Sequence, residues 1–85
     1  MILTIRQIAA LRYISGTIGV GPFQVGQYLV AADLASGGHM AVGSGICGSL
    51  RKLGMIVYVP GAGWRTTEAG RVAAAAGPRM EPEEG

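Results

Sequence analysis

The sequence predicts a mainly α-helical domain with one small β-hairpin, in the order helix, helix, helix, strand, strand, helix. Three observations predict it. A helical pattern stops at Gly54, directly before the β-branched and aromatic run Ile56-Val57-Tyr58-Val59. The dipeptide Pro60-Gly61 suits the centre of a tight turn, because proline fixes φ and glycine accepts a positive φ. After a short second strand, Thr67-Glu68 is typical of a new helix start.

Size and charge limit the organisation of the chain. Its 85 residues are enough for one small domain with a single core. Hydrophobic residues make up 49% of it and the mean hydropathy is +0.39, which is apolar for so small a domain and favours a partner or a dimer. Residues 1–78 carry six Arg or Lys against two Asp or Glu, a net +4, whereas residues 79–85 carry one against three, a net −2. We therefore expect a domain over residues 1–77 and a disordered acidic tail over 78–85.

Several classes of protein are disfavoured by the composition. Arg6 and Arg12 interrupt the apolar stretch near the start of the chain, so we expect neither a membrane span nor a signal peptide, and a cytoplasmic location. With a single cysteine and a single histidine, the chain is expected to form no internal disulfide, to bind no metal and to need no cofactor. Asp33 and Glu68 are the acids of residues 1–78 and no nucleophile has a matched base, so we do not expect an enzyme.

The first helix is predicted to begin at Thr4 and to end by Gly16. Thr4-Ile5-Arg6-Gln7 has the capping-box pattern, in which the threonine and glutamine side chains satisfy backbone N–H groups of the first turn. Arg6, Gln7 and Tyr13 should look outward or flank the apolar side. The apolar stripe of this helix is expected to be Ile5, Ile8, Leu11 and Ile14.

The second helix should run from Phe23 to about Ala35, after a break at Gly21-Pro22. Proline suits a first helical position, where its missing N–H would have no partner. Its stripe is expected to be Val25, Leu29 and Ala32.

The third helix should run from Met40 or Ala41 to Leu53, with Val42, Ile46, Leu50 and Leu53 as its apolar stripe. Gly43, Gly45 and Gly48 lie inside it and would together cost about 3 kcal/mol relative to alanine. Two explanations are open. The helix begins nearer Ser44, or the glycines permit another backbone to approach closely.

The hairpin should return through Trp64-Arg65-Thr66, with Trp64 and Thr66 on one face and Arg65 on the other. Thr67 is predicted to cap the last helix, which Gly77-Pro78 ends. The stripe of this helix is expected to be Ala69, Val72, Ala73 and Ala76.

Two segments carry a resemblance to a known fold family: Leu50-Arg51-Lys52-Leu53-Gly54-Met55-Ile56 and Trp64-Arg65-Thr66-Thr67-Glu68-Ala69-Gly70-Arg71. They resemble the winged helix-turn-helix domains of bacterial and phage transcription regulators, MarR-type and related families above all, over roughly residues 3–77. The resemblance implies that the third helix enters the major groove of double-stranded DNA while the hairpin, or wing, meets the backbone or minor groove. The residues that it places at the DNA are Ser44, Gly45, Cys47, Gly48, Arg51 and Lys52 of the third helix and Arg65 of the wing.

The function expected from this resemblance is a small DNA-binding transcriptional regulator, as a monomer or a homodimer. An alternative is open because the third helix is rich in glycine. Ala41, Gly45, Gly48 and Lys52 fall on one face by their spacing and would form a smooth patch. A second copy or another protein would pack on this patch if the chain were a protein-interaction module that does not bind DNA.

Overall fold

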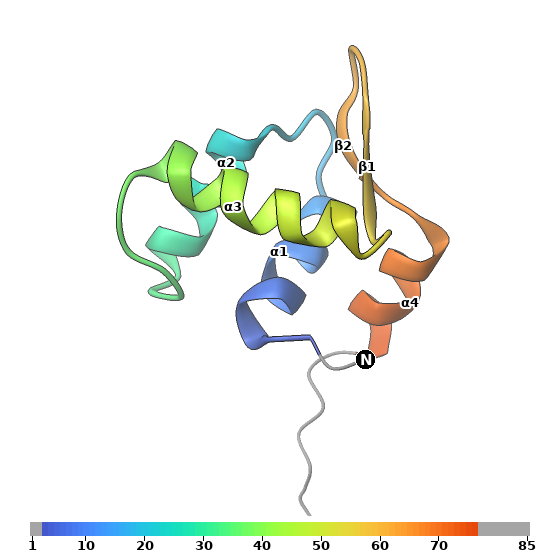
Figure 1. Ribbon diagram of the computed structural model, residues 1–85, viewed down its shortest axis with the longest axis horizontal. Helices are drawn as coiled ribbons and strands as arrows, with labels where there is room; N and C mark the ends of the chain where they lie inside the picture. The colour runs from blue at the N-terminus through green and yellow to red at the C-terminus, as the bar shows by residue number, and fades with distance from the viewer. Residues whose placement is uncertain (1–2, 77–85) are drawn as a thin grey trace, which may run out of the picture.

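The computed structural model describes residues 3–76 of the chain (Figure 1). It is mainly helical, with a small antiparallel hairpin, as the sequence predicts. The predicted tail over residues 78–85 and the last residue of the predicted domain, Gly77, lie outside the described residues. The elements are α1 (Ile5–Ser15), α2 (Pro22–Ala31), α3 (His39–Lys52), β1 (Ile56–Val59), β2 (Gly63–Thr66) and α4 (Glu68–Ala76).

Helix α1 begins with the predicted capping box. The Thr4 hydroxyl accepts a hydrogen bond from the Gln7 N–H at 3.0 Å, and the Thr4 N–H donates to the Gln7 side-chain oxygen at 2.9 Å. Ile8, Leu11 and Ile14 are buried as expected. The prediction for Ile5 is wrong: its side chain is 60% exposed, because the first turn of α1 precedes the part of the helix that the core covers.

Helix α2 ends four residues earlier than about Ala35, at Ala31. Asp33 adopts a left-handed conformation with φ of 61°, and the Leu34 N–H donates to the Leu29 carbonyl at 2.9 Å. This pairing is the Schellman motif, which satisfies the last carbonyls of a helix. Ala32 is the exposed C-cap rather than a packing residue, so its place in the predicted stripe is wrong.

Helix α3 runs unbroken through its glycines and packs extensively against α2. A Cβ atom on Gly43 would collide with the Pro22 carbonyl, and one on Gly26 with the His39 carbonyl. Close approach of two backbones, the second of the two explanations considered, therefore accounts for Gly43. The helix ends in a second Schellman motif, in which Gly54 has φ of 76° and the Met55 N–H donates to the Leu50 carbonyl at 3.0 Å.

The contact with α2 also sets which side of α3 faces inward. Gly43, Cys47 and Leu50 are its buried residues. The predicted stripe is therefore rotated: Val42 and Ile46 are half-buried at the border of the core, and Leu53 is exposed at the C-cap.

The hairpin pairs Ile56 with Thr66 and Val59 with Gly63 in an antiparallel register. Its turn is closed by a hydrogen bond from the Ala62 N–H to the Val59 carbonyl at 2.9 Å, and Gly61 has φ of 82°, the positive φ that a type II turn requires at this position. Trp64 also pairs with Val20, whose carbonyl accepts the Trp64 N–H at 2.8 Å. The segment between α1 and α2 is thus joined to the edge of β2 by a single bridge at Val20.

Helix α4 begins with the predicted cap. The Gly70 N–H donates to the Thr67 hydroxyl at 3.1 Å, and this hydroxyl donates to the Gly54 carbonyl at 2.6 Å. The predicted packing stripe is wrong for Ala69, Val72 and Ala76, which are exposed. Gly70 and Ala74 are buried instead, so this side of α4 faces inward. At Gly70 the backbone of α4 lies so close to the Met55 carbonyl that a Cβ atom there would collide with it.

The core lies where α1, α2, α3 and the base of the hairpin meet, and α4 covers the side of α1 (Figure 1). Its largest fully buried side chains are those of Leu11, Ile14, Val20, Val25, Leu29, Cys47, Leu50 and Ile56. Trp64 packs against this cluster and so joins β2 to the core.

Candidate nucleic-acid interface

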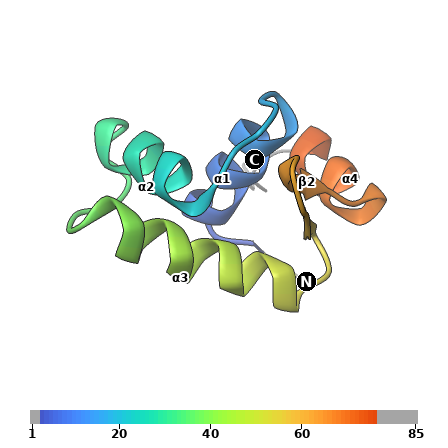
Figure 2. The same cartoon turned by 90° about the horizontal axis from the view of Figure 1, so that it is seen from above.

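Helix α3 lies at the surface over its whole length. Figure 2 shows it along one edge of the molecule, with α1 and α2 on one side of it. The side that faces away from the core carries Ala41, Ser44, Gly45, Gly48, Arg51 and Lys52; Gly48 is half-buried and the others are exposed.

Cys47 does not belong to this surface, so its prediction as a DNA-contacting residue is wrong. Its side chain is 1% exposed and lies in the hydrophobic core. It follows Gly43 by four residues and precedes Leu50 by three, which puts it on their side of the helix. Burial raises the pKa of the Cys47 thiol from 9.0 to about 11, so the thiol is neutral and a poor nucleophile.

The outward glycines differ from Gly43 in one physical respect. A Cβ atom added to Gly45 or to Gly48 would meet no atom within 4 Å. Packing within residues 3–76 therefore requires glycine at position 43 and not at 45 or 48. Their effect is to leave the middle of the exposed side of α3 without side chains.

The six basic residues of the described part fall into two groups. Arg6, Arg12 and Arg71 each donate a hydrogen bond to a backbone carbonyl, those of Leu34, Ala74 and Thr66 respectively. Arg51, Lys52 and Arg65 are exposed and form no side-chain hydrogen bond or ion pair with residues 3–76.

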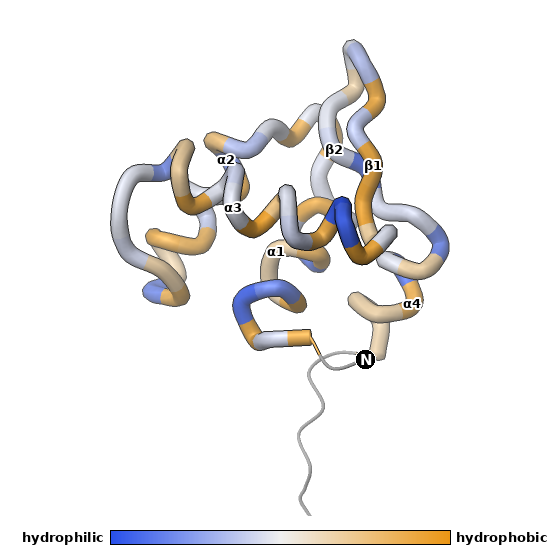
Figure 3. Tube along the Cα trace, viewed as in Figure 1, coloured by the Kyte–Doolittle hydropathy of each residue, from blue (hydrophilic) through white to orange (hydrophobic). Residues whose placement is uncertain are grey.

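Arg51 and Lys52 occupy the last turn of α3, which is the most hydrophilic part of that helix (Figure 3). A cation there is also favoured by the partial negative charge of the helix C-terminus. Arg65 lies on β2, opposite Val57, on the face away from Trp64, as predicted.

The hairpin beyond Arg65 is apolar rather than basic. Val57, Tyr58 and Val59 are exposed large hydrophobic residues, and the turn Pro60-Gly61-Ala62 carries no charge. Tyr58 packs edge-on against Trp64, with ring centroids 5.2 Å apart, and still exposes 51% of its surface. Cationic contacts from the hairpin would come from its stem and not from its tip.

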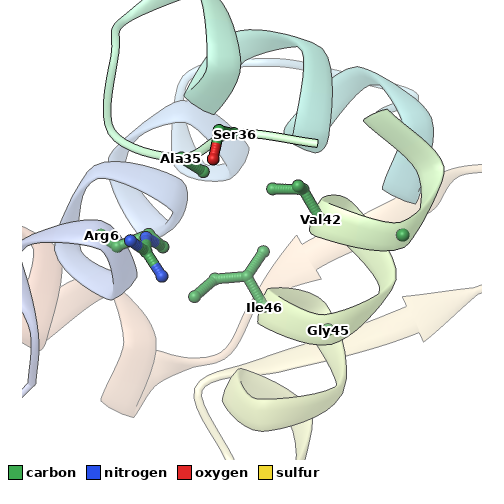
Figure 4. Close-up of a pocket in the computed structure, with 7 residues that line it drawn as sticks. Arg6, Ala35, Ser36, Val42, Gly45 and Ile46 are labelled. Atoms are coloured by element: carbon green, nitrogen blue, oxygen red, sulfur yellow. The ribbon is translucent and has the colours of Figure 1, made fainter. Parts of the chain in front are cut away.

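Two clefts run along α3 on its border with α1. One, of about 460 Å³, lies between Arg6, the segment Ala35-Ser36 and the first half of α3 (Figure 4). The other, of about 700 Å³, lies between Gln7 and the second half of α3, down to Lys52. Gly45 lines both clefts, so they adjoin.

The site residues predicted from sequence are thus brought together on one surface, with two exceptions. Cys47 is in the core, and Arg65 is on the hairpin stem rather than on α3. Sequence reasoning missed Arg6 and Gln7 as neighbours of this surface. No local pattern indicates it, since Arg6 and Gln7 meet α3 only through the packing of α1.

Within residues 3–76, no three His, Cys, Asp or Glu side chains come together in a group that could hold a metal ion. In the same part of the chain, none of the helices has both the length and the apolar character that a membrane crossing needs. The clefts beside α3 contain arginine, lysine, amide and hydroxyl groups, which can bind anions through charge and hydrogen bonds.

Comparisons of the chain with models of protein families, with curated proteins and with solved structures gave no match.

Proposed function

We propose that this chain is a winged helix-turn-helix domain that binds double-stranded DNA through α3 and the hairpin, as a small transcriptional regulator. The order of the elements supports it, as does the bridge at Val20 that joins the segment before α2 to the edge of the hairpin. In this arrangement α2 and α3 form the helix-turn-helix, and α3 is the helix that enters the major groove.

The observation that carries the proposal is the composition of the exposed side of α3. Arg51 and Lys52 have no partner within residues 3–76, and Gly45 and Gly48 leave a bare backbone that packing does not require. Phosphate contacts need accessible cations, and a bare helix surface lets the backbone come close to the edges of bases. Ser44 is the hydroxyl of this surface that would reach a base edge.

The test is the salt dependence of binding to a short duplex of mixed sequence, measured by fluorescence anisotropy. Affinity should fall steeply between about 50 and 200 mM salt, with a log–log slope of about −0.9 for each phosphate contact. Arg51→Ala should flatten this slope by about one unit.

Arg12→Ala is the matched control, because Arg12 is an exposed arginine that bonds to the Ala74 carbonyl of α4 and lines neither cleft beside α3. It should leave the slope unchanged. A wild-type chain that does not bind the duplex at the lowest salt would refute the proposal.

A second candidate function is supported by the same surface. Ala41, Gly45 and Gly48 form a smooth strip on which a second copy or another protein could pack. Gly48→Leu should then abolish self-association in the ultracentrifuge while the melting temperature stays close to that of the wild type, since the position is open. An association state that is the same in both chains would count against a homodimer through this strip.

The two candidates are compatible in one respect. A DNA-binding domain with so few free cations gains apparent affinity when two copies are joined, because the second then binds at a high effective concentration. If the strip on α3 is used for DNA, a dimer must form elsewhere, and Gly48→Leu would then weaken DNA binding without changing the association state.

A further inference from the structure

The inference concerns the adjoining clefts between the start of α1 and α3, called here the α1–α3 groove. Figure 1 shows α3 crossing the front of the molecule, with the hairpin rising on one side of it and the start of α1 on the other. Arg6 and Gln7 form one wall of the groove, and the residues from Ala41 to Lys52 form the other. The groove thus follows α3 for about 16 Å, at 1.5 Å per residue.

The charge of the groove is positive. Arg6 lies in the cleft beside the first half of α3, and Lys52 lies in the cleft at its end. Among residues 3–76, neither lining contains an acidic residue. Asp33 shares a third cleft with Arg6, but the two side chains form no ion pair.

A hydrogen bond holds the side chain of Arg6 in place. The Arg6 Nε donates to the Leu34 carbonyl at 2.7 Å, and the two terminal nitrogens of its guanidinium have no partner within residues 3–76. In Figure 4 the guanidinium lies at the edge of the cleft, facing Ile46. Fixing a guanidinium in advance lowers the entropy that it loses on binding an anion.

Gln7 is held in the same way. Its side-chain oxygen accepts the Thr4 N–H at 2.9 Å, and its Nε2 donates to the Ser49 hydroxyl at 2.8 Å. Because Ser49 accepts this bond, its own O–H can donate, and it finds no acceptor within residues 3–76. The groove therefore presents the held guanidinium of Arg6, the Ser49 hydroxyl and the ammonium group of Lys52 along one side of α3.

We propose that the α1–α3 groove binds the phosphates of one DNA strand, with Arg6 as its main contact. This rests on the proposed function. A helix about 10–12 Å across fills a major groove about 12 Å wide, so phosphates of both strands flank it. Arg65 on the hairpin serves one flank of α3, and Arg6 serves the other.

The test compares three variants for binding to the mixed-sequence duplex from about 50 to 200 mM salt. Arg6→Ala should weaken binding and flatten the log–log slope by about one unit, so that the wild-type advantage shrinks about 3.5-fold over this range. Arg6→Lys keeps the charge and should keep the slope. Arg12→Ala removes an arginine that is anchored in the same manner but to α4, and should change neither.

Both Arg6→Ala and Arg6→Lys remove the Nε–H that bonds to the Leu34 carbonyl, but only Arg6→Ala removes the charge, so the pair separates the charge of Arg6 from its guanidinium anchor. Equal weakening by both would show that Arg6 acts by holding the segment after α2, and would overturn the proposal. A slope for Arg6→Ala equal to that for Arg12→Ala would overturn it as well. In either case the wild type still binds DNA, whereas failure of the wild type to bind would refute the proposed function itself.

Discussion

Alanine substitutions at the glycines of α3 should have opposite effects on stability, although all three glycines lie in one helix. In a helix interior alanine is favoured over glycine by about 1 kcal/mol. At Gly45 and Gly48 a new Cβ meets no atom within 4 Å, so this gain should appear in full. The double variant should gain about 2 kcal/mol, or about 8–16 °C in melting temperature for a domain of this size.

Gly43→Ala should destabilise the fold despite the same gain in helix propensity. Its Cβ would collide with the Pro22 carbonyl, which is backbone and cannot turn away. To make room, α2 and α3 must move apart, and overpacking of this kind costs about 1–3 kcal/mol. Urea unfolding followed by circular dichroism measures both effects. A Gly43→Ala chain that is as stable as wild type, or a Gly45→Ala chain that is less stable, would refute the reasoning.

The same variants test why Gly45 and Gly48 are glycine. If they serve close approach to a ligand, the more stable double variant should bind DNA more weakly than wild type. Higher stability with undiminished DNA binding and unchanged self-association would show that the bare surface serves neither ligand.

Three further predictions concern single side chains. Thr67→Ala removes the hydroxyl that joins the Gly54 carbonyl to the Gly70 N–H, and should lower the free energy of unfolding by about 1–2 kcal/mol in urea titrations; an unchanged midpoint would contradict this role. Asp33→Gly should stabilise the chain by about 0.5 kcal/mol, because relief of the left-handed conformation, about 1–2 kcal/mol, exceeds the added entropy of the unfolded chain, about 1 kcal/mol; a lower melting temperature would argue against it. The pKa of Cys47 is raised from 9.0 to about 11, so the unfolded chain ionises first and stability should fall as pH rises from 9 to 11. In Cys47→Ala the free energy of unfolding should fall less between pH 9 and 11 than in the wild type. If the two plots of this free energy against pH run parallel, ionisation of Cys47 does not contribute to the fall.

Local chemistry explains which parts of the fold could be predicted from the sequence. The capping box at Thr4, the stop at Gly54, the turn at Pro60-Gly61 and the cap at Thr67 each depend on a few adjacent residues. Their hydrogen bonds form within four residues or require a positive φ that glycine accepts. They suffice to divide the chain into its elements.

Tertiary contacts explain where the predictions from sequence were wrong, namely at the end of α2 and in the buried sides of the helices. Asp33 takes a left-handed position where glycine is the usual residue, so the end of α2 carries no strong signal. Gly43 and Gly70 allow a helix to turn its glycine side inward, which rotates the buried stripe away from the larger apolar residues. The burial of Cys47 and the exposure of Val72 both follow from this rotation. The spacing of large apolar residues does not indicate the rotation, because glycine does not count in that pattern.

The candidate site could be predicted only where its residues belong to one helix or strand. Exposed positions on α3 follow from its periodicity once the inward side is known, and Arg65 follows from alternation along β2. Arg6 and Gln7 come beside α3 through the packing of α1. Their hydrogen-bond partners are 28 and 42 residues away in sequence: Leu34, in the segment after α2, and Ser49, on α3. Spacing within one element carries no information on such neighbours.

Within residues 3–76, the hairpin is attached to the rest of the chain along β2 and at its base. Thr67 ties the end of α3 to the start of α4 there, and Val20 holds β2 at Trp64. The turn Pro60-Gly61-Ala62 lies beyond both attachments, whereas Gly63 still packs against the backbone of Gly19 and Val20. Insertions or new charges at this turn should leave the core and the register of the stem intact, so the length and charge of the tip are open to evolutionary change independently of folding. In a protein that uses one scaffold for different targets, this is the segment in which variation costs the least stability.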